Sequence, residues 1–388
     1  MAKIFYSMAG EGRGHAARVR SMVELLRQEH ELVLFAPDQA HEFLEPRYPH
    51  GTPQVEVRRI PGLRFQYTRG RLDLTRTICG GLGYLWKLPG LVAHLKEVIR
   101  AEQPDLVITD FEPALPRAAR ACGVPFISLN HQHFLVACDL RSLPWGLRSQ
   151  ANLMSLAVRA HHWGQRQTIV SSFFQTPLRR GFEDVLQIGP LLRPEIRSAK
   201  PSTGDFLVSY LRPNTPPQVI EILCKSPLPV KVYGLGEQAS RGSAAFCPLS
   251  EQGFVSDLAN CAAVVGSAGN QTLGESLYLG KPVLALPEDQ HHEQQINAHF
   301  LQQMGTGLNV PLEQFAPQHL TYFLDRLAEL RAPLTDCRRR FDGNLAAVLA
   351  IRRNLAEKDQ QDTSVVRCGT IARSRPGKPA LAQSSDSN

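Results

Sequence analysis

The chain has 388 residues, of which 43% are apolar, and it carries a formal net charge of +7. This length exceeds the size at which one hydrophobic core stops growing, so the sequence predicts two domains. The apolar runs are too short, and too often broken by charge or proline, to predict a transmembrane helix. Although the charge is basic, no nucleic-acid recognition motif accompanies it, which argues against a nucleic-acid partner.

The start of the chain and its cysteines indicate a compartment. Met1 leads directly into a strand pattern, so we expect no signal peptide. The cysteines, 8 in number, are scattered without CxxC pairs, a distribution that favours reduced thiols. The sequence therefore predicts a cytoplasmic protein.

The first predicted strand, Lys3 to Met8, runs into a glycine-rich turn, and an amphipathic helix and a second strand, Glu31 to Ala36, follow. The turn contains Gly12 and Gly14 and ends at His15. These residues could do no more than shape a tight turn and start the helix. A rival interpretation is a dinucleotide-binding turn, but a histidine stands where the third glycine of that fingerprint is needed.

The segment from Pro104 to Asn130 predicts strand Leu106 to Thr109, a helix from Ala114 to Cys122 and a further strand. Asp110 stands at the end of the first of these strands. If it shares one sheet edge with His15, its carboxylate can hold the imidazole tautomer and stabilise the imidazolium. Glu112 is the alternative partner, and Asp110 could instead cap the next helix.

A stretch rich in proline, glycine and charge, residues 191–204, predicts the linker between two domains. The first domain is then 1–190 and the second 205–335. A helix within 336–356 is expected to cross back to the first domain. From residue 357 to 388 the composition turns polar and loses periodicity, which predicts a disordered tail.

The most informative segment runs from Gly266 to His299. An apolar strand, Cys261 to Val265, ends there in small residues, and the sequence predicts a helix from an Asn270 N-cap to Gly280. The strand Pro282 to Leu286 and a polar loop follow. In open parallel sheets ligands bind at the carboxyl ends of strands, and a helix start attracts phosphate. Individually, Glu275 could serve only the helix dipole, and Glu293 and Gln294 only a solvated face.

The spacing Gly269-x-x-Thr272-x-x-Glu275, followed by Gly280-x-Pro282 and Glu293-Gln294, resembles the donor-nucleotide segment of GT-B glycosyltransferases. It looks closest to the MurG-like and UDP-glycosyltransferase branches, the type with a glycosyltransferase family 28 C-terminal domain. The turn ending at His15 is similar to the acceptor-side start of the same family. The resemblance implies an α/β fold in which two Rossmann-like, doubly wound parallel-sheet domains face a cleft.

This resemblance also implies an activity and a division of labour. The protein would transfer a sugar from a nucleoside diphosphate, with UDP favoured, to an acceptor hydroxyl, with inversion and with neither metal nor other cofactor. His15 would be the base, assisted by Asp110, while Gly12 and Gly14 would form the acceptor or phosphate loop. The diphosphate of the donor would be bound by Gly269, Asn270, Gln271 and Thr272. Its ribose would be bound by Glu275, and its sugar by Glu293 and Gln294.

Basic residues alternate with apolar ones from Arg58 to Lys87 and again from Leu135 to Trp163. Such a mixture suits an anionic lipid surface, so a lipid-linked acceptor and peripheral contact with the inner face of the membrane are expected. A helical subdomain with solvated arginines explains the pattern equally well. Other functions left open are a sugar-nucleotide epimerase or hydrolase, a non-catalytic nucleotide-sugar binder, and a nicotinamide-dependent oxidoreductase using Gly12 and Asp38.

Overall fold

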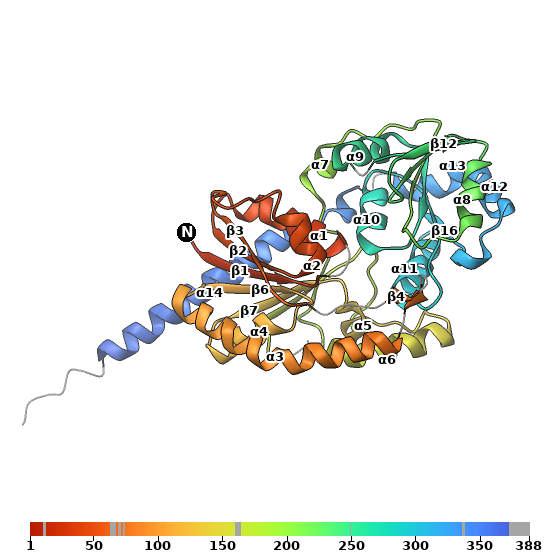
Figure 1. Ribbon diagram of the computed structural model, residues 1–388. Coiled ribbons are helices and arrows are strands. Elements are labelled where there is room, and N and C mark those ends of the chain that lie inside the picture. The colour runs from red at the N-terminus through yellow and green to blue at the C-terminus, as the bar shows by residue number, and fades with distance from the viewer. Residues whose placement is uncertain are drawn as a thin grey trace, which may run out of the picture.

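The computed structural model describes residues 1–10, 13–62, 67–68, 71–72, 74–159, 164–248, 250–335 and 338–371. Two lobes lie side by side (Figure 1), each built on a seven-stranded sheet with helices on both faces. The two-sheet α/β architecture predicted from the sequence is therefore confirmed.

The first sheet is parallel throughout, in the order β3-β2-β1-β6-β7-β8-β9. Side chains of β1 alternate between two cores: Ile4 and Tyr6 join the cluster under α1 and α14, while Phe5 joins the cluster under α3 and α4. Burial on both faces explains why these strands are almost continuously apolar. The strands are β1 (Lys3–Met8), β2 (Glu31–Ala36), β3 (Val55–Arg59), β6 (Leu106–Asp110), β7 (Phe126–Asn130), β8 (Gln167–Ser171) and β9 (Leu186–Ile188).

The helices of the first lobe connect these strands, and a short hairpin precedes the longest of them. They are α1 (Arg13–Leu26), α2 (Asp38–Leu44), α3 (Leu74–Glu102), α4 (Ala114–Ala121), α5 (Phe134–Ala137) and α6 (Trp145–Arg159), with the hairpin strands β4 (Tyr67–Thr68) and β5 (Arg71–Leu72). Among the residues described, no helix is long and apolar enough to cross a bilayer.

The second sheet has the order β12-β13-β11-β10-β14-β15-β16, and only its edge strand β12 runs antiparallel to its neighbour. Its strands are β10 (Leu207–Tyr210), β11 (Val230–Tyr233), β12 (Gln238–Arg241), β13 (Ala244–Phe246), β14 (Ala263–Gly266), β15 (Val283–Ala285) and β16 (Gly307–Asn309). One face packs on α8 (Pro217–Cys224), α12 (Pro317–Asp325) and α13 (Leu327–Arg331). The other packs on α9 (Glu251–Asn260), α10 (Asn270–Tyr278) and α11 (His292–Gln303), which face the first lobe.

The chain crosses between the lobes twice, and the two crossings touch. The linker carries α7 (Pro194–Ser198), and the return ends in α14 (Asn344–Ile371), which lies against the first lobe (Figure 1). Gly343 N donates to Pro190 O at 2.9 Å. A Cβ added at Gly343 would lie only 2.1 Å from Gly189 O, so glycine is needed there.

Helix α14 continues beyond residue 357, where the sequence was expected to become a disordered tail. The helix extends to Ile371, and this stretch contains no proline, and no glycine before Gly369, that would interrupt it. Residues 372–388 of that expected tail lie outside the described part of the chain.

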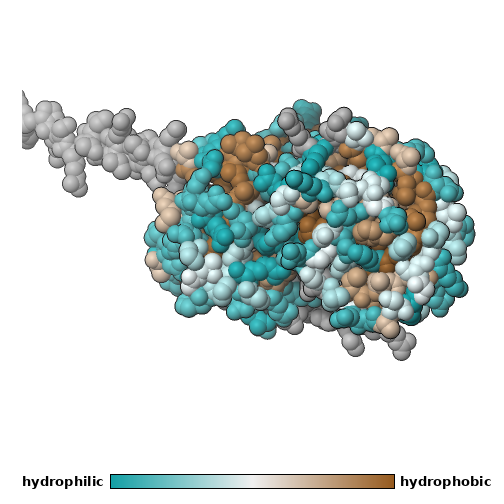
Figure 2. Space-filling view, turned by 90° about the horizontal axis from the view of Figure 1, so that it is seen from above, coloured by the Kyte–Doolittle hydropathy of each residue, from teal (hydrophilic) through white to brown (hydrophobic). Residues whose placement is uncertain are grey.

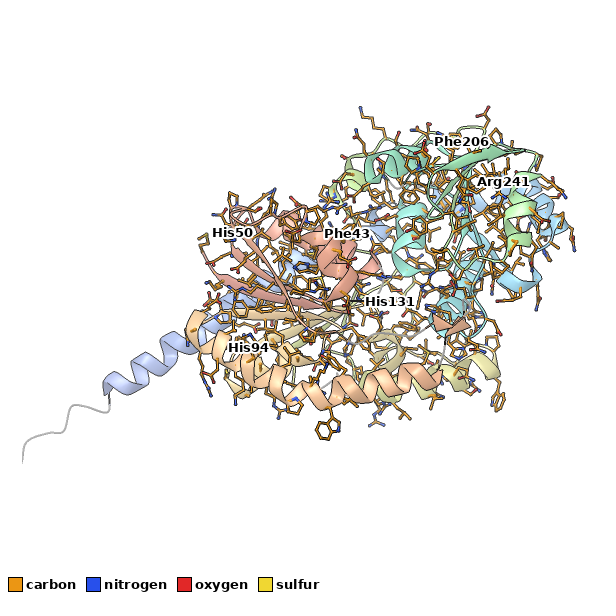
Figure 3. The ribbon with its side chains drawn as sticks, viewed as in Figure 1. Phe43, His50, His94, His131, Phe206 and Arg241 are labelled. Carbon is orange, nitrogen blue, oxygen red and sulfur yellow. The ribbon has the colours of Figure 1, made fainter. Side chains whose placement is uncertain are left out.

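The lobes share an apolar interface. Phe174, which follows β8, stacks on Phe300 of α11 with ring centroids 4.1 Å apart. Both side chains belong to one apolar cluster, which contains buried residues of both lobes. His131 lies where the lobes meet (Figure 3). The face seen from above is mostly hydrophilic with scattered apolar areas (Figure 2).

Candidate active site

The first half of the candidate site stands at the carboxyl ends of β1 and β6. These strands are adjacent and parallel, in a register that pairs Met8 with Asp110. Ala9 N donates to Asp110 O at 2.9 Å, which holds the turn after β1 beside the end of β6. Phe111 has φ of +61°, an uncommon value for a bulky residue that re-aims the chain directly after Asp110.

His15 and Asp110 are in contact. Nδ1 of His15 lies 3.1 Å from Oδ1 of Asp110, whose side chain is fully buried, while 15% of the His15 side chain remains exposed. An imidazole held at Nδ1 by a carboxylate presents its other nitrogen, Nε2, to a reacting hydroxyl. The structure thus brings together the two residues that the sequence predicts as a base and its orienter.

Arg18, a residue that the sequence interpretation missed, completes this cluster. Its Nε and Nη2 donate to Asp110 Oδ2 and Oδ1 at 3.0 and 2.7 Å. Burial alone would raise the pKa of Asp110, but the charges of Arg18 and His15 outweigh it and hold that pKa below its usual value. The sequence signal that could have identified Arg18 is its position three residues after His15, because residues three apart on a helix share a face.

The other predicted residues of the first lobe have different surroundings. Gly14 lies in the first turn of α1, where an added Cβ would meet nothing within 4 Å. Gly12 lies outside the described residues. Glu112 accepts from the N–H groups of Ala114 and Leu115 at 2.6 and 2.9 Å, and so caps α4 instead of serving His15.

The second half of the site begins at the start of α10, which packs near α1 across the boundary. Gly269 is the N-cap of α10 and has no side chain to cap the first turn, whose Gln271 and Thr272 are half-buried. An added Cβ at Gly269 would meet nothing within 4 Å. Uncapped N–H groups beside open space form an arrangement that suits a phosphate.

Asn270 is the first helical residue and not the N-cap that the sequence predicts. Its side chain is turned to the first lobe, where Nδ2 donates to Ser171 O at 3.3 Å and Oδ1 accepts from Phe173 N at 3.4 Å. The prediction missed this because a cap preference is local, whereas these partners come from another domain.

Glu275, the predicted ribose ligand, is held by an arginine of the linker. Arg193 Nε and Nη2 donate to Glu275 Oε1 and Oε2 at 2.8 and 2.5 Å, and Gln271 Nε2 donates to Oε1 at 2.8 Å. The Glu275 side chain is only 2% exposed. Both its oxygens are therefore engaged within the protein, and a ribose hydroxyl would have to share or replace the Arg193 contact.

Glu293 reaches from α11 to the first lobe, but Gln294 does not. Glu293 Oε2 accepts from Gln132 Nε2 at 3.3 Å. Burial would raise the pKa of Glu293, but His131, His291, His15 and Arg18 together lower it. Gln294 is buried, and its Oε1 accepts from Glu288 N at 3.1 Å, so it shapes the loop before α11.

His131 also joins the lobes and was not predicted as a site residue. Its fully buried ring places Nδ1 at 3.2 Å from Ser171 O and Nε2 at 3.1 Å from Asn297 Oδ1. Asn297 Nδ2 in turn donates to Ala268 O at 3.0 Å, in the turn before α10. No group of three or more His, Cys, Asp or Glu side chains in the described chain is arranged to hold a metal ion.

The comparisons with known proteins place this arrangement in a family. The family model described as glycosyl transferase family 1 matches residues 2–328. The chain belongs to glycosyltransferase family 1. This membership confirms the glycosyltransferase resemblance drawn from the two glycine-rich turns.

Several known proteins resemble this family 1 glycosyltransferase, one in part of its sequence and others in fold. An uncharacterized glycosyltransferase of Methanopyrus kandleri is 31% identical over 70 residues, which are 18% of this chain and 20% of that protein, so the match spans about a fifth of that relative's length. Arabidopsis thaliana UGT89C1, complexed with UDP-L-rhamnose, has a TM-score of 0.66 at 13% identity and covers 92% of this chain and 99% of its own. Acinetobacter baumannii MurG has a TM-score of 0.59 at 13% identity, covering 91% and 100%.

Proposed function

We propose that this protein transfers a sugar from a nucleoside diphosphate to an acceptor hydroxyl, in a single inverting displacement that needs no metal. The observation that supports this most directly is the contact between His15 and Asp110 at a sheet edge that Glu293 of the other lobe approaches. UDP and dTDP are the candidate nucleotides, since UGT89C1 was solved with UDP-L-rhamnose and VinC, of the same fold, with dTDP; we propose UDP.

In this mechanism His15 acts as the base. Nε2 takes the proton from the acceptor hydroxyl while that oxygen attacks the anomeric carbon of the donor sugar. The bond from this carbon to the diphosphate oxygen breaks, and its electron pair leaves with the nucleoside diphosphate. Asp110 accepts a hydrogen bond from Nδ1–H and stabilises the imidazolium that forms.

The start of α10 serves the leaving group. Gly269 has no side chain to exclude a phosphate, and the uncapped N–H groups of Asn270, Gln271 and Thr272 stand at the positive end of the helix. Donors fixed in advance stabilise the charge that develops on the diphosphate. Glu293, on α11 of the same lobe, binds a hydroxyl of the donor sugar.

Nucleotide binding tests the donor half of this proposal. Calorimetric titrations with UDP, dTDP, GDP and NAD should show binding of one nucleoside diphosphate. Binding should weaken in Thr272→Val, which keeps the backbone N–H and the side chain's shape but loses the hydroxyl that we assign, beside the N–H groups, to the diphosphate. Thr321→Val, on α12 of the same lobe, is the matched control. Binding of NAD alone, or of no diphosphate, would contradict the proposal.

Product analysis tests the reaction itself. With the matching sugar nucleotide and an alcohol acceptor, proton NMR should reveal a glycoside of inverted anomeric configuration, formed at the same rate with and without EDTA. Free sugar formed without acceptor would identify a hydrolase, and a changed sugar still attached to its nucleotide would identify an epimerase.

The acceptor is proposed to be presented at an anionic lipid surface. On α3, Leu85 and Trp86 are 55% and 90% exposed, and on α6 Trp145 is 76% exposed. The side chains of residues 63–82, which carry much of the basic pattern, lie outside the description. Co-sedimentation with vesicles of phosphatidylcholine and phosphatidylglycerol should fall in Trp86→Ser and Trp145→Ser, but not in Tyr322→Ser of the other lobe. Equal sedimentation of all variants would contradict this part.

A further inference from the structure

The mechanism above gives Arg18 no task, although its guanidinium contacts both members of the proposed dyad. Nη2 of Arg18 lies 2.9 Å from His15 Nδ1 and 2.7 Å from Asp110 Oδ1. Arg18 is 3% exposed and Asp110 is fully buried, so the pair is sealed from solvent. Because Nε also bonds to Oδ2, the guanidinium fixes the plane of the carboxylate, not merely its charge.

The three atoms allow two arrangements for a neutral His15. In one, Nδ1–H donates to Asp110 Oδ1, 3.1 Å away, and Nε2 carries a free lone pair. In the other, Nδ1 accepts from Arg18 Nη2 and Nε2 carries the proton. Only the first arrangement can act as a base at Nε2. An ionised Asp110, oriented by two bonds from Arg18, favours the first.

We propose that Arg18 is a positioning residue that orients the Asp110 carboxylate toward Nδ1 of His15, so that the neutral imidazole carries its proton on Nδ1 and leaves Nε2 free as the base. This inference rests on the proposed function, since it gives the base a third member. It predicts that loss of the two bonds from Arg18 to Asp110 allows the ring to adopt the other tautomer, with the proton on Nε2.

The test combines 15N NMR of the His15 ring with steady-state kinetics. In Arg18→Gln, which retains one amide donor for Asp110 but loses the two-point contact, the ring 15N shifts should move toward those of the Nε2-protonated tautomer. In Arg18→Lys the charge remains but the two-point geometry is lost, so kcat should fall about tenfold while KM is unchanged.

Arg20→Gln is the matched control, because Arg20 lies on the same helix but pairs with Glu195 and Glu251. It should leave the ring 15N shifts of His15 unchanged. Wild-type ring shifts in Arg18→Gln, or a wild-type kcat in Arg18→Lys should Arg18→Gln fail to fold, would overturn the inference. The NMR spectra need no turnover, so they remain informative even if the protein transfers no sugar. An active His15→Gln enzyme would instead refute the proposed function.

Discussion

The two edges that form the candidate site are built on opposite principles. In the first lobe, Asp110 and Arg18 are buried, fully bonded and in contact with His15. In the second lobe, the turn at Gly269 is uncapped and faces open space, while Glu275 and Gln294 are occupied by other partners. The groups proposed for proton transfer are therefore held in place before a substrate binds. The donor side instead provides mainly backbone N–H groups and open space.

The largest expected effect comes from breaking the fixed edge at its reacting atom. His15→Gln should lower kcat by about 10²- to 10⁴-fold, because the proton of the acceptor hydroxyl loses its base. Calorimetry should show unchanged nucleotide affinity, since the donor edge belongs to the other lobe. A variant with wild-type turnover would remove the distinction between the edges.

A second prediction concerns the stability of the fixed edge. Asp110→Asn leaves the Arg18 guanidinium buried without a counter-charge and should reduce the free energy of unfolding by about 3–5 kcal/mol. Urea unfolding measures this loss. The control Glu97→Gln, which breaks the exposed pair with Arg100, should leave the midpoint unchanged. Equal stability of both variants would mean that the buried pair is not needed for folding.

The third prediction sharpens the account of the open edge. A Cβ added at Gly274 of α10 would lie 2.4 Å from Pro190 Cγ of the linker, so Gly274→Ala should destabilise the protein by about 1–3 kcal/mol. Gly83→Ala on α3, where nothing lies within 4 Å, should stabilise it by about 0.5–1 kcal/mol. Thermal unfolding should therefore give shifts of opposite sign, and matching signs would rule out a tight contact at Pro190.

The smallest expected effect is an acid dependence of the fixed edge. The pKa of Asp110 is lowered in the folded protein by Arg18 and His15 despite its burial. Its contribution to stability is complete above the ordinary aspartate value, about 4, and is lost as pH falls through the lowered value. Urea unfolding midpoints, measured from about pH 6 down to about pH 3, should fall more for wild type than for Asp110→Asn. Parallel curves would show that Asp110 is not the group responsible.

The sequence predicted the strands and turns of the site because their signals are local. Apolar runs gave β1, β6 and β14, and the C-terminal glycine of α10 was identified at Gly280, where φ is +73°. Contacts between lobes have no such signal. Arg193 and Glu275 are separated by 82 positions, and Asn270 and Ser171 by 99, so neither pairing could be predicted. Gln294 accepts from Glu288 N in its own loop, and its expected contact with the donor sugar stays a prediction.

The contact between Gly189 and Gly343 has a mechanical consequence. The two chain segments that connect the lobes meet at this point, where the Asn344 side chain is hydrogen-bonded to Leu192 N and O at 2.7 and 2.8 Å. Because the two crossings are bonded to each other, we expect the lobes to rotate about this point as a hinge and not to slide past one another. Opening would separate Phe174 from Phe300 and Gln132 from Glu293. The hinge would return the two lobes to the same relative position at each closure.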